Sequence, residues 1–145
     1  MKLKYLRGKN GIILKSIMDV IIPPGGPFKA GASDYDLVPR IEEILKSYNP
    51  AVRNYFHLLL KYIQLSSIVH TGRTFTRLSA EKAERFLQKM ESSPLYYRRM
   101  ILLVIKLVVM LAFYDRDDVA EQIGYIHGCH LELHETVKRQ KQVFL

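Results

Sequence analysis

The chain has 145 residues, 48% of them apolar and 25% charged, a composition that excludes a disordered chain and suffices for one domain with a buried core. Lys and Arg number 22 against 14 Asp and Glu, and the resulting formal charge of +8 favours an acidic partner, an anionic membrane surface or nucleic acid without choosing among them. The single cysteine, Cys129, cannot form an internal disulfide, so the fold does not depend on an oxidising compartment.

The first third of the chain predicts two helices joined by an irregular loop. In residues 11–22 the apolar side chains recur at spacings of one, three and four, as in an amphipathic helix, and Pro23 and Pro24 end the pattern. Residues 25–33 contain too much Gly, Ala and Pro for a regular element, so we expect a surface loop. A second helix is expected over residues 36–48. Its inward-facing residues are predicted to be Leu37, Ile41, Ile44 and Leu45.

A longer helix is predicted to begin at Asn49-Pro50, because Asn is a good N-cap and Pro suits the first helical position. It is expected to reach about Val69, and because its polar stripe is narrow, we expect it to be largely covered. Residues 71–78 read as a connector. Ser79 is predicted to cap a helix over residues 80–91, whose core side consists of Ala83, Phe86, Leu87 and Met90.

The longest apolar stretch follows Ser93 and Pro94, which predict a helix start. Residues 100–113 contain one charge, Lys106, and are otherwise apolar around the whole helix axis. We therefore expect a central helix surrounded on all sides, with Lys106 reaching an edge. This helix and the one that begins at Asn49-Pro50 carry more apolar surface than a small bundle covers, so a partner is expected to cover the remainder. The stretch is too short to span a bilayer, which needs about 20 apolar residues.

A short last helix is expected between Asp115, as its cap, and Gly124, with Asp117 and Asp118 in its first turn. No alternating strand pattern and no internal repeat is present in the sequence. The sequence therefore predicts an all-α, single-domain bundle of about six helices around a central apolar helix. Residues 1–145 form this domain, with residues 126–145 as a C-terminal extension that is mobile or binds a partner.

Three groups of polar residues are candidates for chemistry. His127, His130 and His134 would share a helical face able to hold zinc, although Gly128 interrupts a helix there; a His-rich polar extension is the other interpretation, and both remain open. The remaining candidates are explained by helix ends, and no catalytic residue is assigned. They are Asp115, Asp117 and Asp118 as acids or magnesium ligands, and Ser66 and Ser67 with His70 as part of a nucleophile pair. Cys129 would point away from the histidine face of a helix, so it does not supply a fourth ligand.

A partner interface is the strongest site prediction. Arginine and aromatic residues together are enriched in protein interfaces, and Arg73, Phe75 and Arg77 combine them in the connector. The other interpretation is a solvated loop. Phe113, Tyr114 and Tyr125 are assigned to the same interface, with core positions as the alternative.

Three motifs in the same order resemble a known family. They are Ile-Met-Asp-Val-Ile-Ile-Pro at residues 17–23 before the Gly/Pro/Ala loop, Arg-Leu-Ser at 77–79 with Arg-Phe-Leu at 85–87, and Leu-Ala-Phe-Tyr at 111–114 leading through Val119 to Ile-Gly-Tyr at 123–125. The sequence resembles the gluconate 2-dehydrogenase subunit 3 family over about residues 11–125. It is also similar to the helical segment ahead of some flavin oxidoreductases of the glucose-methanol-choline type.

The resemblance implies a non-catalytic small subunit that binds and stabilises a large FAD-dependent alcohol or sugar dehydrogenase. FAD would reside in that large partner and no cofactor in this chain, and an electron-transfer protein would be reached through the partner. Some relatives carry a twin-arginine export signal; here the only twin arginine, Arg98-Arg99, lies deep in the chain.

The alternative function is a basic helical module that binds nucleic acid or an anionic membrane surface. No recognition-helix pattern appears and the cations are spread along the chain, so nucleic acid is not favoured, while peripheral membrane contact stays open. Lys15 and Asp19 interrupt the apolar start, so we expect neither a signal peptide nor a transmembrane helix. The expected location is cytoplasmic, or wherever the partner carries the chain.

Overall fold

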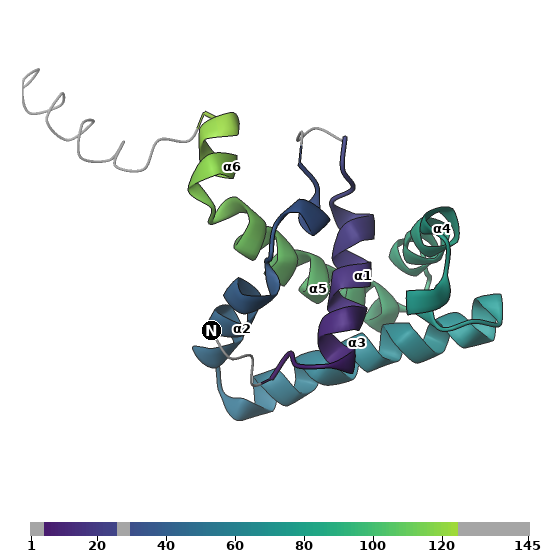
Figure 1. Cartoon of the computed structure of the whole chain (residues 1–145). Helices are drawn as coiled ribbons and strands as arrows, with labels where there is room; N and C mark the ends of the chain where they lie inside the picture. Colours follow the sequence, from purple (N-terminus) through teal and green to yellow (C-terminus); the bar gives the residue numbers. More distant parts are fainter. Residues whose placement is uncertain (1–4, 26–29, 125–145) are drawn as a thin grey trace, which may run out of the picture. The chain divides into compact units, whose positions relative to one another are not determined.

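The computed structural model describes residues 5–25 and 30–124. These residues fall into two compact units that divide between Phe113 and Tyr114, and each unit is described by itself. Within the described residues the structure contains six α-helices, two short 3₁₀ helices and no strand, so the all-α prediction is confirmed (Figure 1). The elements are α1 (Lys9–Ile21), η1 (Ala32–Asp34), α2 (Val38–Lys46), α3 (Pro50–Thr71), η2 (Phe75–Arg77), α4 (Ala80–Glu91), α5 (Tyr96–Tyr114) and α6 (Asp117–Gln122).

Helix α1 is the element that contacts the most neighbours in the first unit. It runs across α3 (Figure 1) and also packs against η1, η2, α2 and α4. Its inward face follows the spacing that predicted the helix, with Leu14 and Ile17 fully buried. Gly11 fits closely under the preceding segment, because a Cβ at this position would lie 2.5 Å from the carbonyl oxygen of Leu6. The core is therefore built around α1.

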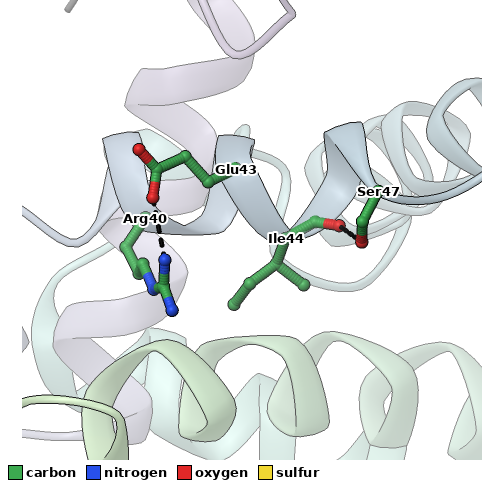
Figure 2. Close-up of polar contacts among 4 residues, drawn as sticks. All are labelled: Arg40, Glu43, Ile44 and Ser47. Carbon is green, nitrogen blue, oxygen red and sulfur yellow. Dashed lines mark hydrogen bonds and ion pairs between the residues drawn. The ribbon is translucent and has the colours of Figure 1, made fainter.

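Helix α2 has a polar outer side and one buried carboxylate. On the outer side Arg40 Nη1 lies 2.9 Å from Glu43 Oε2, and the Ser47 hydroxyl donates to the Ile44 carbonyl at the helix end (Figure 2). Glu42, in contrast, is completely buried. Its Oε2 accepts hydrogen bonds from the backbone N–H groups of Tyr5 at 3.3 Å and Leu6 at 3.1 Å. This carboxylate thus fastens the N-terminal segment to α2.

Helix α3 begins and ends as its sequence predicts. The Asn49 side chain accepts a hydrogen bond from the Ala51 N–H at 3.0 Å, and Pro50 occupies the first helical position. The helix ends at Thr71, two residues beyond the predicted end, where Gly72 adopts φ of +73°. Such a left-handed residue is a common way to end a helix, and glycine adopts it without a Cβ clash.

Two predicted helix starts need correction. Helix α5 begins at Tyr96 rather than beside Pro94, and the Ser93 hydroxyl accepts from the Leu95 N–H at 3.3 Å within the preceding turn. Asp115 does not cap α6: the N-cap is Arg116, whose guanidinium pairs with Asp118 in the first turn. The carboxylates of Asp117 and Asp118 still lie where the helix dipole favours negative charge.

The four residues predicted for the inner side of α4 are all buried. The Phe86 ring packs 5.9 Å, centroid to centroid, from the rings of both Phe75 and His70. Ser79 is the N-cap residue of α4, but its hydroxyl makes no capping hydrogen bond. The predicted pattern of α4 was therefore right on its inner face, and α4 joins α3 and η2 in one aromatic cluster.

The helices of the described ranges include none that is long and apolar enough to cross a bilayer. The extension predicted over residues 126–145 lies outside the described residues.

Candidate partner interface

Large apolar side chains are exposed mainly on two helices. Within the described part of the chain, twelve of the sixteen exposed large apolar residues belong to α3 or α5. On α5, Leu103, Leu107 and Leu111 are 46%, 54% and 56% exposed. Within this chain α5 is therefore not enclosed on all sides: the chain covers one side, which includes Ile105 and Val109, and leaves the other open, as expected where apolar surface remains for a partner.

Helix α3 is open in the same way. Leu58 and Leu65 are 60% and 61% exposed and Val69 is 84% exposed, whereas Leu60 and Ile63 on the inner side are fully buried. This chain by itself therefore covers less of α3 than predicted, and the uncovered apolar surface remains for a partner. Contiguous apolar surface of this kind on a folded protein marks sites of association.

The connector after α3 is held firmly and carries two exposed arginines. The Ser67 hydroxyl donates to the Arg73 carbonyl at 2.9 Å, and the Gln64 side chain bonds both the N–H and the hydroxyl of Thr76. Phe75 is 1% exposed and belongs to the core, so it anchors the connector and is not available to a partner. Arg73 and Arg77 are exposed, and both line a surface depression of about 450 Å³ that also involves Ile68 of α3.

The second predicted set, Phe113, Tyr114 and Tyr125, also contains one core residue and one exposed residue. Phe113 is 1% exposed, and its ring meets that of Tyr35 edge-on at 5.9 Å between centroids. Tyr114 is 42% exposed, and Tyr125 lies outside the described residues. The two phenylalanines thus take the core positions that the sequence left open. Contact of Arg73, Arg77 and Tyr114 with a partner stays a prediction.

The serine and histidine residues near the end of α3 are engaged with the backbone. The Ser66 hydroxyl donates to the Ile63 carbonyl, and His70 Nδ1 lies 3.0 Å from the Ser66 carbonyl. Ser67, as described above, bonds the connector. These contacts do not form a nucleophile pair.

Within residues 5–25 and 30–124, no group of three or more His, Cys, Asp or Glu side chains lies close enough to bind an ion. The candidate ligands His127, Cys129, His130 and His134 lie outside the residues that the structure describes.

The charged side chains of α3 and α5 are all positive. Neither α3 nor α5 contains an Asp or Glu, while α3 carries Arg53 and Lys61 and α5 carries three cations. One of these is neutralised within the chain: Lys106 Nζ lies 2.9 Å from Glu91 Oε1, so the prediction that Lys106 reaches an edge is confirmed. A partner that covers these helices would meet apolar side chains bordered by positive charge.

On the side of α3 that faces α1, the half-buried side chain of His57 has a lowered pKa. Burial, and secondly the Lys61 cation, lower the pKa of His57, while the Glu42 carboxylate opposes this shift. Asn10 Nδ2 lies 3.3 Å from His57 Nδ1. Because an amide nitrogen only donates, this hydrogen bond requires an unprotonated ring nitrogen, in agreement with a neutral His57.

Two features were missed from the sequence, although a signal existed for each. Val38, Glu42 and Leu45 are spaced at i, i+4 and i+7, so Glu42 shares the buried face of α2 despite its charge. The exposed apolar residues of α3 also recur at helical spacing, on a side away from the core face.

The chain matches a known protein family. The family model described as Gluconate 2-dehydrogenase subunit 3 matches residues 10–121, which is most of the chain. No curated protein and no solved structure matches the chain significantly.

Proposed function

The chain belongs to the gluconate 2-dehydrogenase subunit 3 family, and from this premise we propose that it is a non-catalytic small subunit that binds and stabilises a large FAD-dependent alcohol or sugar dehydrogenase. Family membership supports an accessory subunit of an oxidoreductase complex. The flavin, the glucose-methanol-choline type of the partner and the stabilising role are the further steps of the proposal. An electron-transfer protein would be reached through that partner.

The observation that carries the proposal is the open apolar side of α3 and α5. Each exposed Leu or Val there costs free energy in water that contact with another protein would recover, at about 25 cal/mol per Å² of apolar area removed from solvent. A permanent small subunit is expected to bury more than ~2,000 Å² in total with its partner. Two helices that leave leucines 46–61% exposed supply surface of this kind.

Co-expression with the proposed large oxidoreductase subunit tests the proposal. The chain produced alone is expected to aggregate or to be poorly soluble, because the apolar sides of α3 and α5 then remain in water. Produced together, the two proteins are expected to elute as one yellow complex whose absorption spectrum is that of a flavin. A stable monomer that ignores the large subunit would show that the proposal is wrong.

A solubility control links this outcome to the apolar surface. The Leu58→Glu/Leu65→Glu variant is expected to raise the soluble yield of the isolated chain several-fold. Lys82→Glu/Lys89→Glu, also seven residues apart but on the exposed polar side of α4, should leave the yield near that of wild type. Equal gains from both double variants would instead indicate a general effect of charge.

The absence of acidic residues from α3 and α5 also bears on the basic-module alternative. Binding of the isolated chain to DNA or to anionic vesicles, with an affinity that falls steeply as salt rises, would favour that alternative.

A further inference from the structure

The exposed side of α3 carries a regular apolar stripe, which we call the α3 seam. Successive members are separated by four, three, four, three and four residues, a repeat of 3.5. The α3 seam consists of Ala51, Tyr55, Leu58, Tyr62, Leu65 and Val69.

The geometry of the seam is that of a helix-docking surface. At 100° per residue its members fall within an arc of about 80°, and 18 steps of 1.5 Å give it a length of about 27 Å. Five of the six are exposed, Leu58 and Leu65 by 60% and 61%, and Tyr62 is half-buried. A 3.5-residue repeat is what keeps one helix in register with another along a shared axis.

The rest of α3 holds the seam in place. The side facing the core includes Phe56, Leu60 and Ile63, each 2% exposed or less, so the helix cannot rotate to hide the seam. The Asn49 cap and the left-handed Gly72 fix the two ends of the helix. The seam is therefore a rigid ridge on a folded unit.

Positive charge borders one side of the seam. Lys61 lies beside it, and Ile68, seven residues further on, lines the same depression as Arg73 and Arg77. Within the described ranges, none of these three cations forms an ion pair with a carboxylate. A partner with acidic residues along one flank would complement this edge.

We propose that the α3 seam docks an amphipathic helix of the large oxidoreductase subunit, one that presents apolar residues at a 3.5-residue repeat with Asp or Glu along the flank facing Lys61, Arg73 and Arg77. The inference rests on the proposed function, since it names the surface through which that complex forms.

Other occupants fit the seam less well. The seam is centred near Leu60, so a two-fold pair of this chain would bring the two Lys61 side chains together with no acid of α3 between them. Acyl chains would leave the hydroxyl groups of Tyr55 and Tyr62, which lie within the stripe, without hydrogen-bond partners. A protein helix with polar flanks provides both the apolar contact and the missing acceptors.

The test compares two double substitutions in chains co-expressed with the tagged large subunit. Leu58→Glu/Leu65→Glu places charge in the α3 seam, and Leu103→Glu/Leu107→Glu makes the same change on the exposed side of α5, where the leucines are 46% and 54% exposed. We expect the first pair to weaken retention on the large subunit about 100-fold or more, at roughly tenfold for each buried anchor. The second pair should weaken retention less than the first, because the three cations that an acidic flank of the partner would meet border the α3 seam.

A charge substitution tests the acidic flank. Lys61→Glu is expected to weaken binding about tenfold at low salt, with a difference from wild type that shrinks as NaCl is raised, while Lys61→Gln has a smaller effect. Thermal unfolding of each variant, followed by circular dichroism, checks that the fold is intact. If the glutamate pair unfolds, Leu58→Ala/Leu65→Ala keeps the apolar helix and repeats the comparison.

The outcomes separate this inference from the proposed function. If wild type is not retained by the large subunit, the proposed function fails. If wild type is retained and the α3 variant binds equally well, or if the α5 variant loses as much, only the assignment to the α3 seam is overturned. Loss of self-association in light scattering, or loss of binding to phosphatidylserine vesicles, as the main effect of the α3 variant would also overturn it.

Discussion

Helices α3 and α4 lie in the same unit and both contribute to one core, yet their outer sides differ completely. The outer side of α4 consists of charged and amide side chains, including an ion pair between Glu81 and Arg85 one turn apart. The outer side of α3 carries leucine, tyrosine and valine. A side chain exposed to water in the working state gains nothing from being apolar, so α4 is suited to solvent and α3 to a second surface.

The largest expected effect is on the free energy of unfolding. It compares a substitution on the inner side of α4 with one on the outer side of α3. Phe86→Ala should lower the free energy of unfolding by about 3–5 kcal/mol, because it opens a cavity against Phe75 in the core. Leu65→Ala should change it by no more than about 0.5 kcal/mol, because this leucine is 61% exposed. Urea unfolding at low protein concentration, followed by circular dichroism, measures both. A loss of several kcal/mol for Leu65→Ala would show that the seam serves this chain's own fold.

Two neighbouring glutamates of α2 provide the next comparison, because Glu42 is buried and Glu43 is exposed. Glu42→Ala leaves the N–H groups of Tyr5 and Leu6 without their acceptor and should cost about 3 kcal/mol. Glu43→Ala removes a surface pair with Arg40 and should cost less than about 1 kcal/mol. The same unfolding measurement applies. Arg53 of α3 lies 4.6 Å from the centre of the Tyr5 ring, so the segment that Glu42 binds also contacts α3. An equal cost of Glu42→Ala and Glu43→Ala would show that the bonds from Glu42 to this segment do not stabilise the fold.

The smallest expected effect concerns the side of α3 that α1 covers. Burial and the Lys61 cation lower the pKa of His57 below 6.5, so the unfolded chain takes up this proton more readily than the folded chain. The contribution of His57 to stability is complete above about pH 6.5 and decreases as the pH falls below it. His57→Gln should therefore reduce the loss of stability between pH 7.5 and 5.5. An unchanged loss would indicate that His57 is as well hydrated as the residues of the outer side.

The sequence predicted best where polar and apolar residues alternate with a clear helical period. The four inner residues of α4 were identified in this way, while the Asn49-Pro50 start of α3 was identified from its capping residues and the edge position of Lys106 from its charge. It predicted least well where a helix is apolar on every side, because periodicity then gives no contrast from which to choose the buried face. For α3 and α5 the sequence predicted more apolar surface than this chain covers, but it did not predict which side of each helix is left open.

In the candidate partner interface, some residues could also be placed from the sequence and others could not. Arginine at residues 73 and 77 could be assigned to the surface from the sequence, since its charge is costly to bury. Phe75 and Phe113 could not be distinguished from contact residues, because an aromatic ring serves equally well in a core or an interface; only the rings of Phe86 and Tyr35 placed beside them decided this. Glu42 required Tyr5 and Leu6, more than 30 residues away, to supply the N–H groups that make its burial tolerable.

By itself the sequence determined that this chain is helical, where most helices begin and end, and to which family it belongs, because these properties depend on local spacing, capping residues and motif order. Tertiary structure alone decided which side of each apolar helix is covered and which is left open. Burial depends on what lies opposite a side chain, and for a helix that is apolar all round that neighbour is not encoded in the helix itself.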